Sequence, residues 1–304
     1  MDKRRIIIDT DPGIDDAAAI TLAIISERFD IRLISATAAN VDVDKTTKNA
    51  LKLVEFFGAD IPVARGCERP LLHELASSPD IHGESGMDGY DFPEPQKKPL
   101  PVHSVEAMRR VIMEEEGKTT LVAIAALTNV ALLFAMYPEV KERIDEIVMM
   151  GGGIYRGNAT SAAEFNIYID PHAAAMVFRS GVPIRMAGLD VTERALLHKD
   201  RLAEMRDSGR AGHMLYSLLT HYRDGDVDAG LAMHDPCTIA LMLEPDMFRM
   251  EEHYVEVVTE GIAAGALVTN LERKMKICCA PNVSVCMDID EKRFEDWFVE
   301  MIRR

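Results

Sequence analysis

The sequence is short of basic residues. It has 34 lysines and arginines against 50 aspartates and glutamates, which gives a formal net charge of −16. Negative charge of this size opposes nonspecific binding to nucleic acids and to anionic membranes. We therefore expect no nucleic-acid or membrane partner, and a neutral or cationic small molecule is easier to accommodate.

Long apolar runs and paired cysteines are also lacking. No run approaches the roughly 20 apolar residues of a membrane-spanning helix. The basic residues 3–5 are followed by three isoleucines before Asp9, too few for the apolar region of a signal peptide. The five cysteines are odd in number and show no C-x-x-C spacing, which favours free thiols in a reducing compartment. We therefore expect a cytoplasmic protein.

No stretch resembles a linker between domains. With 304 residues and 48% hydrophobic content, the chain can bury a large core. The one proline-rich patch, residues 92–101, is short and suits a surface loop between elements. We expect a single domain over residues 1–304.

The chain does concentrate carboxylates in one place. The apolar run at residues 6–8 is followed by four aspartates within eight residues, which are Asp9, Asp11, Asp15 and Asp16. Like charges packed this closely cost free energy unless a cation or sugar hydroxyls compensate them. Hard oxygen ligands suit Ca²⁺ or Mg²⁺ rather than Zn²⁺, so the cluster predicts a bound metal.

Helix capping offers an alternative explanation of these aspartates. Residues 5–8 suit a buried parallel strand and residues 17–25 a helix. Asp11 can then be the N-cap, with Pro12 at the first helical position. Asp15 and Asp16 would fall in the first turn, where the helix dipole favours anions.

The pattern of an apolar run that ends in polar or glycine residues before a helix recurs along the chain. The later runs are residues 31–39, 121–126, 147–150 and 184–188. Alternation of strand and helix predicts an α/β fold with a mostly parallel sheet flanked by helices. Right-handed crossovers bring the strand ends to one edge, where ligands bind. The aspartates, Asn40 and the turn at 124–129 can therefore converge.

Two segments rich in glycine and polar residues, 73–92 and 222–230, could close over the same edge. Mobile lids have this composition, and so do ordinary surface loops. The two interpretations stay open at this stage.

Two further polar groupings allow both a structural and a functional interpretation. Residues 157–171 collect amides and carboxylates that could grip sugar hydroxyls or could form a polar turn before a helix near Asp170. Asp235 could be the N-cap of a helix with Pro236 at its first position. In the functional alternative, Asp235 binds the metal and His234 donates a proton near neutral pH.

Six motifs together resemble those of one enzyme family. They are DTDPGIDD at 9–16, HGESG at 82–86, MGGG at 150–153, AEFN at 163–166, GLD at 188–190 and HDPC at 234–237. Their identity and order are similar to those of the nucleoside hydrolases, the inosine-uridine-preferring and ribonucleoside hydrolase family. The match extends over nearly the whole chain, so a chance origin is excluded.

The resemblance implies a single α/β domain with a Ca²⁺ ion at the carboxyl edge of its sheet. Asp11, Asp16 and Asp235 match side-chain ligands of the calcium, and Ile124 matches a backbone carbonyl ligand. Asp11 also matches the general base that acts on a calcium-bound water, and His234 matches the proton donor to the leaving base. Alanines at 125–126, where the family usually has glycine or proline, depart from the pattern.

The implied reaction is hydrolysis of the N-glycosidic bond of ribonucleosides to ribose and free nucleobase, by a homodimer or homotetramer. The full set of substrate-binding candidates is Asp15, Asn40, His82, Met150, Asn158, Glu164, Phe165, Asn166 and Tyr222. Tyr90 and His221 are further candidates to contact the base. The single tryptophan, Trp297, is expected to anchor the last helix, at 291–302.

Purine-specific members of the family use tryptophan stacking on the base. Because Trp297 is expected in the last helix instead, the sequence favours a pyrimidine-preferring or broad-specificity enzyme. A catalytically silent riboside-binding protein is the alternative, although the catalytic candidates Asp11 and His234 are both present. A Mg²⁺-dependent phosphohydrolase would need basic residues to bind phosphate, and none stands between Asp9 and Arg28.

Overall fold

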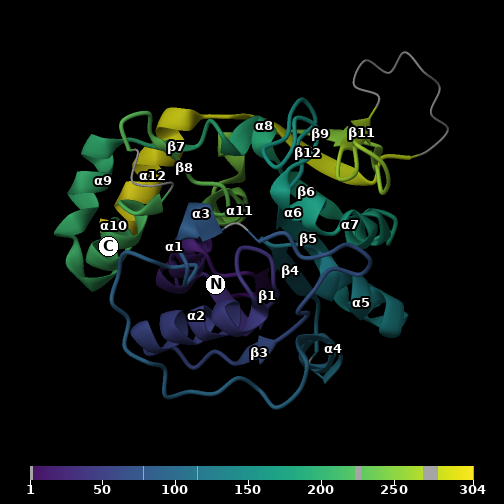
Figure 1. Ribbon diagram of the computed structural model, residues 1–304, viewed down its shortest axis with the longest axis horizontal. Coiled ribbons are helices and arrows are strands. Elements are labelled where there is room, and N and C mark those ends of the chain that lie inside the picture. Colours follow the sequence, from purple (N-terminus) through teal and green to yellow (C-terminus); the bar gives the residue numbers. More distant parts are fainter. Residues whose placement is uncertain (1–2, 78, 115, 223–226, 270–279, 304) are drawn as a thin grey trace.

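The computed structural model describes residues 3–303 except 78, 115, 223–226 and 270–279, and a large twisted sheet forms its centre (Figure 1). The strand order is β3-β2-β1-β4-β5-β6-β12-β9. Neighbouring strands from β3 to β12 run parallel, and β9 at the edge runs antiparallel to β12. The mostly parallel α/β sheet predicted from the sequence is therefore confirmed.

The sheet strands are β1 (Arg4–Thr10), β2 (Phe29–Ala36), β3 (Val63–Arg65), β4 (Thr119–Ala123), β5 (Ile144–Met150), β6 (Ile184–Ala187), β9 (Phe248–His253) and β12 (Val283–Ile289). Two short antiparallel pairs lie outside it, β7 (Leu196–Leu197) with β8 (Leu231–Ala232), and β10 (Val255–Val257) with β11 (Leu267–Thr269).

The helices that connect the strands vary from one turn to almost four. They are α1 (Ile14–Ile25), α2 (Val43–Phe56), α3 (Pro79–His82), α4 (Ser104–Glu114), α5 (Thr128–Met136), α6 (Phe165–Ile169), α7 (Pro171–Phe178), α8 (Leu189–Thr192), α9 (Lys199–Arg206), α10 (Gly209–Leu219), α11 (Pro236–Leu243) and α12 (Glu291–Arg303). The 3₁₀ helices η1 (Pro138–Arg143) and η3 (Pro245–Met247) precede β5 and β9. Within the described residues, no helix is long and apolar enough to cross a membrane.

Both faces of the sheet are covered. Successive side chains of a strand point to opposite faces, so Ile6 and Ile8 of β1 pack in one apolar cluster and Ile7 in another. The first cluster includes α1, α2, α10, α11 and α12, and the second includes α4, α5 and α7. Two buried faces explain why these strands are continuous apolar runs in the sequence.

The structure corrects one detail of the first turn. Helix α1 begins at Ile14 with Gly13 as its N-cap, so the prediction that Asp11 caps the helix with Pro12 at its first position is wrong. Asp16 supplies the cap interaction instead, because its Oδ2 accepts a hydrogen bond from the Gly13 N–H at 2.9 Å. The placement of Asp15 and Asp16 in the first turn is confirmed.

Several peripheral expectations are also confirmed. Residues 92–101 form an irregular segment with many exposed side chains. Trp297 on α12 is 9% exposed and packs against Phe294. Cys67, Cys237 and Cys286 are buried free thiols, whereas Cys278 and Cys279 lie outside the described residues.

Candidate active site

One cavity of about 760 Å³ lies at the carboxyl edge of the sheet and brings the predicted site residues together. Strands β1 and β4 end at Thr10 and Ala123, directly before the lining residues Asp11 and Ile124, and β5 ends at Met150, which itself lines the cavity. The predicted catalytic residues, metal ligands and main substrate-binding candidates line it: Asp11, Asp15, Asp16, Asn40, His82, Ile124, Met150, Asn158, Glu164, Phe165, Asn166, Tyr222, His234 and Asp235.

The turn from β1 to α1 is fixed by hydrogen bonds to its own aspartate. Asp16 accepts hydrogen bonds from the Thr10 hydroxyl at 2.5 Å and from Asn40 Nδ2 at 3.2 Å, in addition to the Gly13 N–H. A Cβ atom on Gly13 would lie 2.6 Å from His82 Nδ1 and 2.8 Å from Asn40 Nδ2. Only glycine therefore lets these two side chains approach the turn so closely.

Asp11 is buried beside this turn, and its two carboxylate oxygens differ in their hydrogen bonding. Its Oδ2 accepts a hydrogen bond from the Asn40 N–H at 2.7 Å. Its Oδ1 is buried and has no hydrogen-bond partner among the described residues. Burial, and secondly the charge of Asp16, raise the pKa of Asp11 well above its usual value. An unpartnered carboxylate oxygen in the interior calls for a cation or a water.

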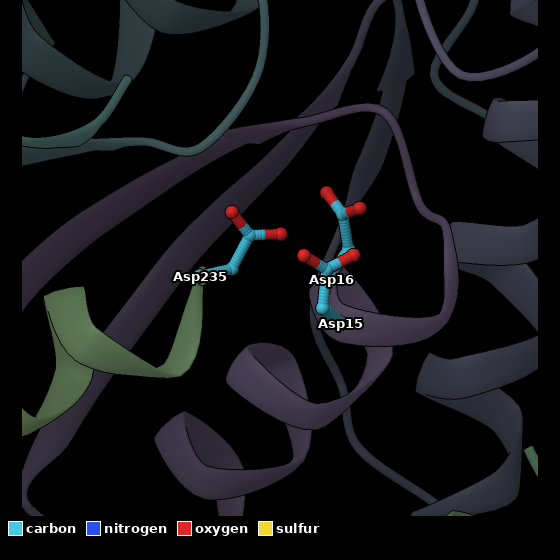
Figure 2. Close-up of side chains that lie close together, drawn as sticks. All are labelled: Asp15, Asp16 and Asp235. Carbon is cyan, nitrogen blue, oxygen red and sulfur yellow. The ribbon is translucent and has the colours of Figure 1, made fainter. Parts of the chain in front are cut away.

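Three carboxylates form a compact group next to Asp11. Ligand atoms of Asp15, Asp16 and Asp235 all lie within 4.8 Å of one another, and all three residues are buried. Figure 2 shows Asp235 at the start of α11 facing the two aspartates of α1. Asp15, which the sequence assigned to the substrate, thus shares this group with two predicted metal ligands.

Asp235 shows that the capping explanation is incomplete. It occupies the N-cap position of α11 with Pro236 in the first turn, as the sequence predicts, but its side chain makes no capping hydrogen bond. Burial, followed by the charges of Asp15 and Asp16, raises the pKa of Asp235 well above its usual value. The carboxylate is therefore available to a cation, and an all-oxygen donor set fits a hard divalent ion.

Ile124 follows β4, and its backbone is placed by the strand beside it. The Ile124 N–H donates to the Asp9 carbonyl at 2.9 Å, so the alanines at 125–126 leave this turn tied to β1. Asn166 Nδ2 lies 3.5 Å from the Ile124 carbonyl oxygen.

A second group of lining residues is held in place by its own hydrogen bonds. Glu164 Oε2 accepts hydrogen bonds from the N–H groups of Gly152 at 2.7 Å and Ile167 at 3.2 Å. Asn166 Nδ2 donates to the Met150 carbonyl at 3.2 Å, and Asn158 Oδ1 accepts from the Phe165 N–H at 2.9 Å. Burial raises the pKa of Glu164. These contacts hold the side chains in the cavity wall.

Aromatic and imidazole rings line another part of the cavity. His82 Nδ1 accepts a hydrogen bond from the Ile14 N–H at 3.1 Å, and its ring centroid lies 5.4 Å from that of Tyr222. His234 Nδ1 lies 2.9 Å from the Thr192 hydroxyl oxygen. Two other candidates lie elsewhere.

Tyr90 and His221 do not belong to this cavity as the described residues define it. Tyr90 packs edge-on against Phe56 and Phe92, and His221 is exposed, with its Nδ1 2.9 Å from the Ser217 carbonyl oxygen. The segment 73–92 does border the cavity through α3 and the residues before it, and residues 223–226 of the second proposed lid lie outside the described residues.

Sequence reasoning missed several lining residues: Ala76, Ser77, Ile81, Ala159, Tyr168 and Glu193. Ile81, Ala159 and Tyr168 lie within two residues of a predicted site residue, and Ala76 and Ser77 fall in the segment 73–92. Glu193 stands apart because it follows α8, and its position three residues after the GLD motif was the available signal. It forms an ion pair with Arg156 at 2.6 Å.

The fold and this acidic cavity are those of one class of enzyme. The family model described as "Inosine-uridine preferring nucleoside hydrolase" matches residues 6–296. The chain belongs to this family, and it is an enzyme that hydrolyses the N-glycosidic bond of nucleosides.

Particular relatives cover almost the whole chain. It is 47% identical over 298 residues to the non-specific ribonucleoside hydrolase RihC of Klebsiella pneumoniae subsp. pneumoniae, covering 98% of this chain and 97% of that protein. The RihC protein of Shigella boydii serotype 18 is 46% identical over 300 residues, with 98% and 97% covered.

Solved structures of the same class superpose closely. The plant nucleoside hydrolase PpNRh1 matches with a TM-score of 0.92 and 31% identity over 99% of each chain. The purine-preferring ribonucleoside hydrolase from Gardnerella vaginalis matches with a TM-score of 0.91 and 28% identity, covering 99% of this chain and 98% of that one.

Proposed function

We propose that the protein hydrolyses ribonucleosides with broad base specificity to ribose and free nucleobase, and that its metal is Ca²⁺ held by Asp11, Asp16, Asp235 and the Ile124 carbonyl. The observation that carries the proposal is the buried, unpartnered Oδ1 of Asp11 beside the group formed by Asp15, Asp16 and Asp235. A cation would compensate charges that the fold leaves close together.

The cation would orient a water molecule and lower its pKa. Asp11 would accept the proton of the attacking water. Its Oδ2 is tied to the Asn40 N–H, and the unpartnered Oδ1 is the oxygen that would take up the proton. One carboxylate base in this role contrasts with the two flanking carboxylates of most O-glycosidases.

The ribose would be held by hydrogen bonds from its hydroxyl groups to Asp15, Asn40, Asn158, Glu164 and Asn166, all of which line the cavity. Cleavage gives the ribose oxocarbenium character, and the surrounding carboxylates stabilise that positive charge in the transition state. Met150 and Phe165 would contact the sugar with apolar surface.

The leaving base takes up negative charge as the bond breaks, and His234 would donate a proton to it. His82 and Tyr222 would contact the base. Trp297 packs in α12, and no tryptophan lines the described cavity. Histidine and tyrosine rings can contact both purine and pyrimidine bases, which supports broad specificity, as does the similarity to proteins described as non-specific ribonucleoside hydrolases.

The proposal is tested by measuring ribose release from uridine, cytidine, inosine and adenosine, with phosphate absent and with Ca²⁺ or EDTA present. We expect release from both purine and pyrimidine ribosides, loss in EDTA and recovery with Ca²⁺. Asp11→Asn should remain folded and lose several orders of magnitude in kcat. Asp60→Asn, an exposed carboxylate remote from the cavity, is the matched control.

Two results would contradict the proposal. A kcat for Asp11→Asn within about tenfold of wild type, roughly 1.4 kcal/mol of barrier, would remove Asp11 as the base. No release from any riboside by folded, calcium-loaded protein would favour a riboside-binding protein instead.

We further infer that the protein acts in the cytoplasm as a homodimer or homotetramer. The buried free thiols support a reducing compartment. The homodimer or homotetramer is what the resemblance to the nucleoside hydrolase family implies. Light scattering across a concentration series would decide between monomer and oligomer.

A further inference from the structure

We propose that Thr192 is a positioning residue for His234, holding the imidazole so that its Nε2 presents a proton to the leaving base. The inference rests on the proposed function and deepens it. The GLD motif at 188–190 and the residues that follow it, which the proposed mechanism leaves without a role, become the support of the proton donor.

The contact between the two side chains is direct and shielded from water. Thr192 is fully buried and His234 is 5% exposed. The Thr192 hydroxyl oxygen lies 2.9 Å from His234 Nδ1. The Thr192 hydroxyl can donate to Nδ1 of the neutral ring, whose single proton is then on Nε2, or accept from the Nδ1–H group of the imidazolium, which carries its second proton on Nε2. In both cases the contact orients the ring and assigns the transferable proton to Nε2, because the partner of one nitrogen sets the role of the other.

The segment that carries Thr192 is clamped to the glycine loop after β5. The Leu189 N–H donates to the Gly152 carbonyl at 2.8 Å. The Asp190 carboxylate accepts from the N–H groups of Ile154 at 2.8 Å and Tyr155 at 3.1 Å. Helix α8 is therefore anchored at its start, one turn before Thr192.

Glycine at 188 makes this anchoring possible. A Cβ atom there would lie 2.8 Å from the Gly152 carbonyl oxygen. A larger residue would push α8 away from the loop and carry Thr192 with it.

The segment that carries His234 is hydrogen-bonded to the residues that follow Thr192. The Met233 N–H donates to the Ala195 carbonyl at 2.9 Å, and Leu196 pairs with Ala232 in the β7–β8 ladder. Thr192 lies three residues before Ala195, and His234 directly follows Met233. The hydroxyl and the imidazole thus belong to one rigid assembly, as an aligned proton donor requires.

The test compares Thr192→Val, which replaces the hydroxyl by a methyl group of similar size, with Thr192→Ser, which keeps it. We expect Thr192→Val to lower kcat for uridine and inosine by at least tenfold with KM within threefold of wild type. Thr192→Ser should restore most of the rate. Thr21→Val is the matched control, because Thr21 is a fully buried threonine whose hydroxyl has no hydrogen-bond partner among the described residues.

A substrate with a good leaving group separates proton donation from other defects. The p-nitrophenolate ion leaves without protonation, so the kcat loss of Thr192→Val on p-nitrophenyl ribofuranoside should be less than threefold. An equal loss on this substrate and on the nucleosides would mean a general distortion of the site and would overturn the inference. Unchanged kcat on both substrate types would overturn it as well.

A readout independent of turnover keeps the inference separable from the proposed function. In ¹⁵N NMR spectra, the ring nitrogens of His234, assigned with His234→Asn, should change their shifts in Thr192→Val and not in Thr192→Ser. Wild-type protein that hydrolyses no riboside would refute the proposed function while the NMR comparison still decides the contact. If Thr192→Val does not fold, Thr192→Ala against Thr192→Ser replaces it in every measurement, with the same deciding outcomes.

Discussion

Replacing Asp235 by asparagine should stabilise the metal-free protein and abolish its response to calcium. The side chain keeps its size but loses a charge that faces Asp15 and Asp16 within 4.8 Å. At an effective dielectric constant of about 20, two charges at this separation repel by about 3 kcal/mol. Burial, and after it the charges of Asp15 and Asp16, raise the pKa of Asp235, so protonation relieves part of this repulsion.

We therefore expect the free energy of unfolding in EDTA at pH 8 to rise by about 2 kcal/mol in Asp235→Asn, a partially relieved repulsion of one charge pair. Calcium at 100 times its dissociation constant should stabilise wild type by about 2.7 kcal/mol. The same calcium concentration should leave the variant unchanged within about 0.5 kcal/mol, because a proposed ligand has lost its charge. Ribose release by the variant should be lower than that by wild type, because the variant no longer binds the metal.

The assay is urea unfolding followed by fluorescence of the single tryptophan, Trp297, at one protein concentration because self-association would shift apparent stability. Asp170→Asn is the control. Its carboxylate is buried and accepts hydrogen bonds from the Leu71 N–H, the Thr128 hydroxyl and the Ala173 N–H, so its loss should destabilise the protein equally with and without calcium. An Asp235→Asn variant less stable than wild type in EDTA would refute the reasoning, as would a variant with the full calcium response.

Three other substitutions or conditions test the surroundings of the site. Asn129→Ala removes a buried amide that donates to Asp9 at 2.9 Å, and should lower the free energy of unfolding by about 3 kcal/mol in urea titrations; a loss below about 1 kcal/mol would contradict this. Burial raises the pKa of Asp9 and Asp16 from 3.8 to about 6. Since the folded state binds these protons more tightly than the unfolded state, stability in EDTA should increase as pH falls from 7 to 5, and urea titrations that show a flat or opposite trend would refute it. Gly13→Ala, whose Cβ would lie 2.6 Å from His82 Nδ1, should lower kcat/KM at least a hundredfold while the circular dichroism spectrum stays native. A kcat/KM near that of wild type would show that the turn accommodates a Cβ atom and would contradict the prediction.

The sheet and the location of the site followed from the sequence because their signals are local. Strands buried on both faces must be apolar throughout, so the runs ending near Thr10, Ala123 and Met150 were visible without any knowledge of their neighbours. The parallel arrangement then places their ends at one edge by geometry alone. Residues as distant as Asp11 and Asp235 could be expected to meet for this reason.

The direction in which individual side chains point could not be predicted from the same local sequence patterns. Asp11 has the spacing of a helix cap, yet the cap interaction comes from Asp16, because the chain turns two residues later than the pattern suggests. Glu193 reaches the cavity from a one-turn helix too short to show periodicity. Asp15 joins the compact carboxylate group although its family match is to the substrate, since neighbouring residues on a first turn can both face the same space.

The hydrogen bonds around the carboxylates bear on how the proposed metal would bind. The Thr10 hydroxyl and the Gly13 N–H hold Asp16, and the Asn40 N–H holds one oxygen of Asp11. These neutral donors stabilise carboxylates in place without neutralising them, so the repulsion persists until a cation arrives. A site fixed in advance loses little conformational freedom on binding. Calcium should therefore bind with little backbone rearrangement, and its removal should leave the cavity formed while lowering stability.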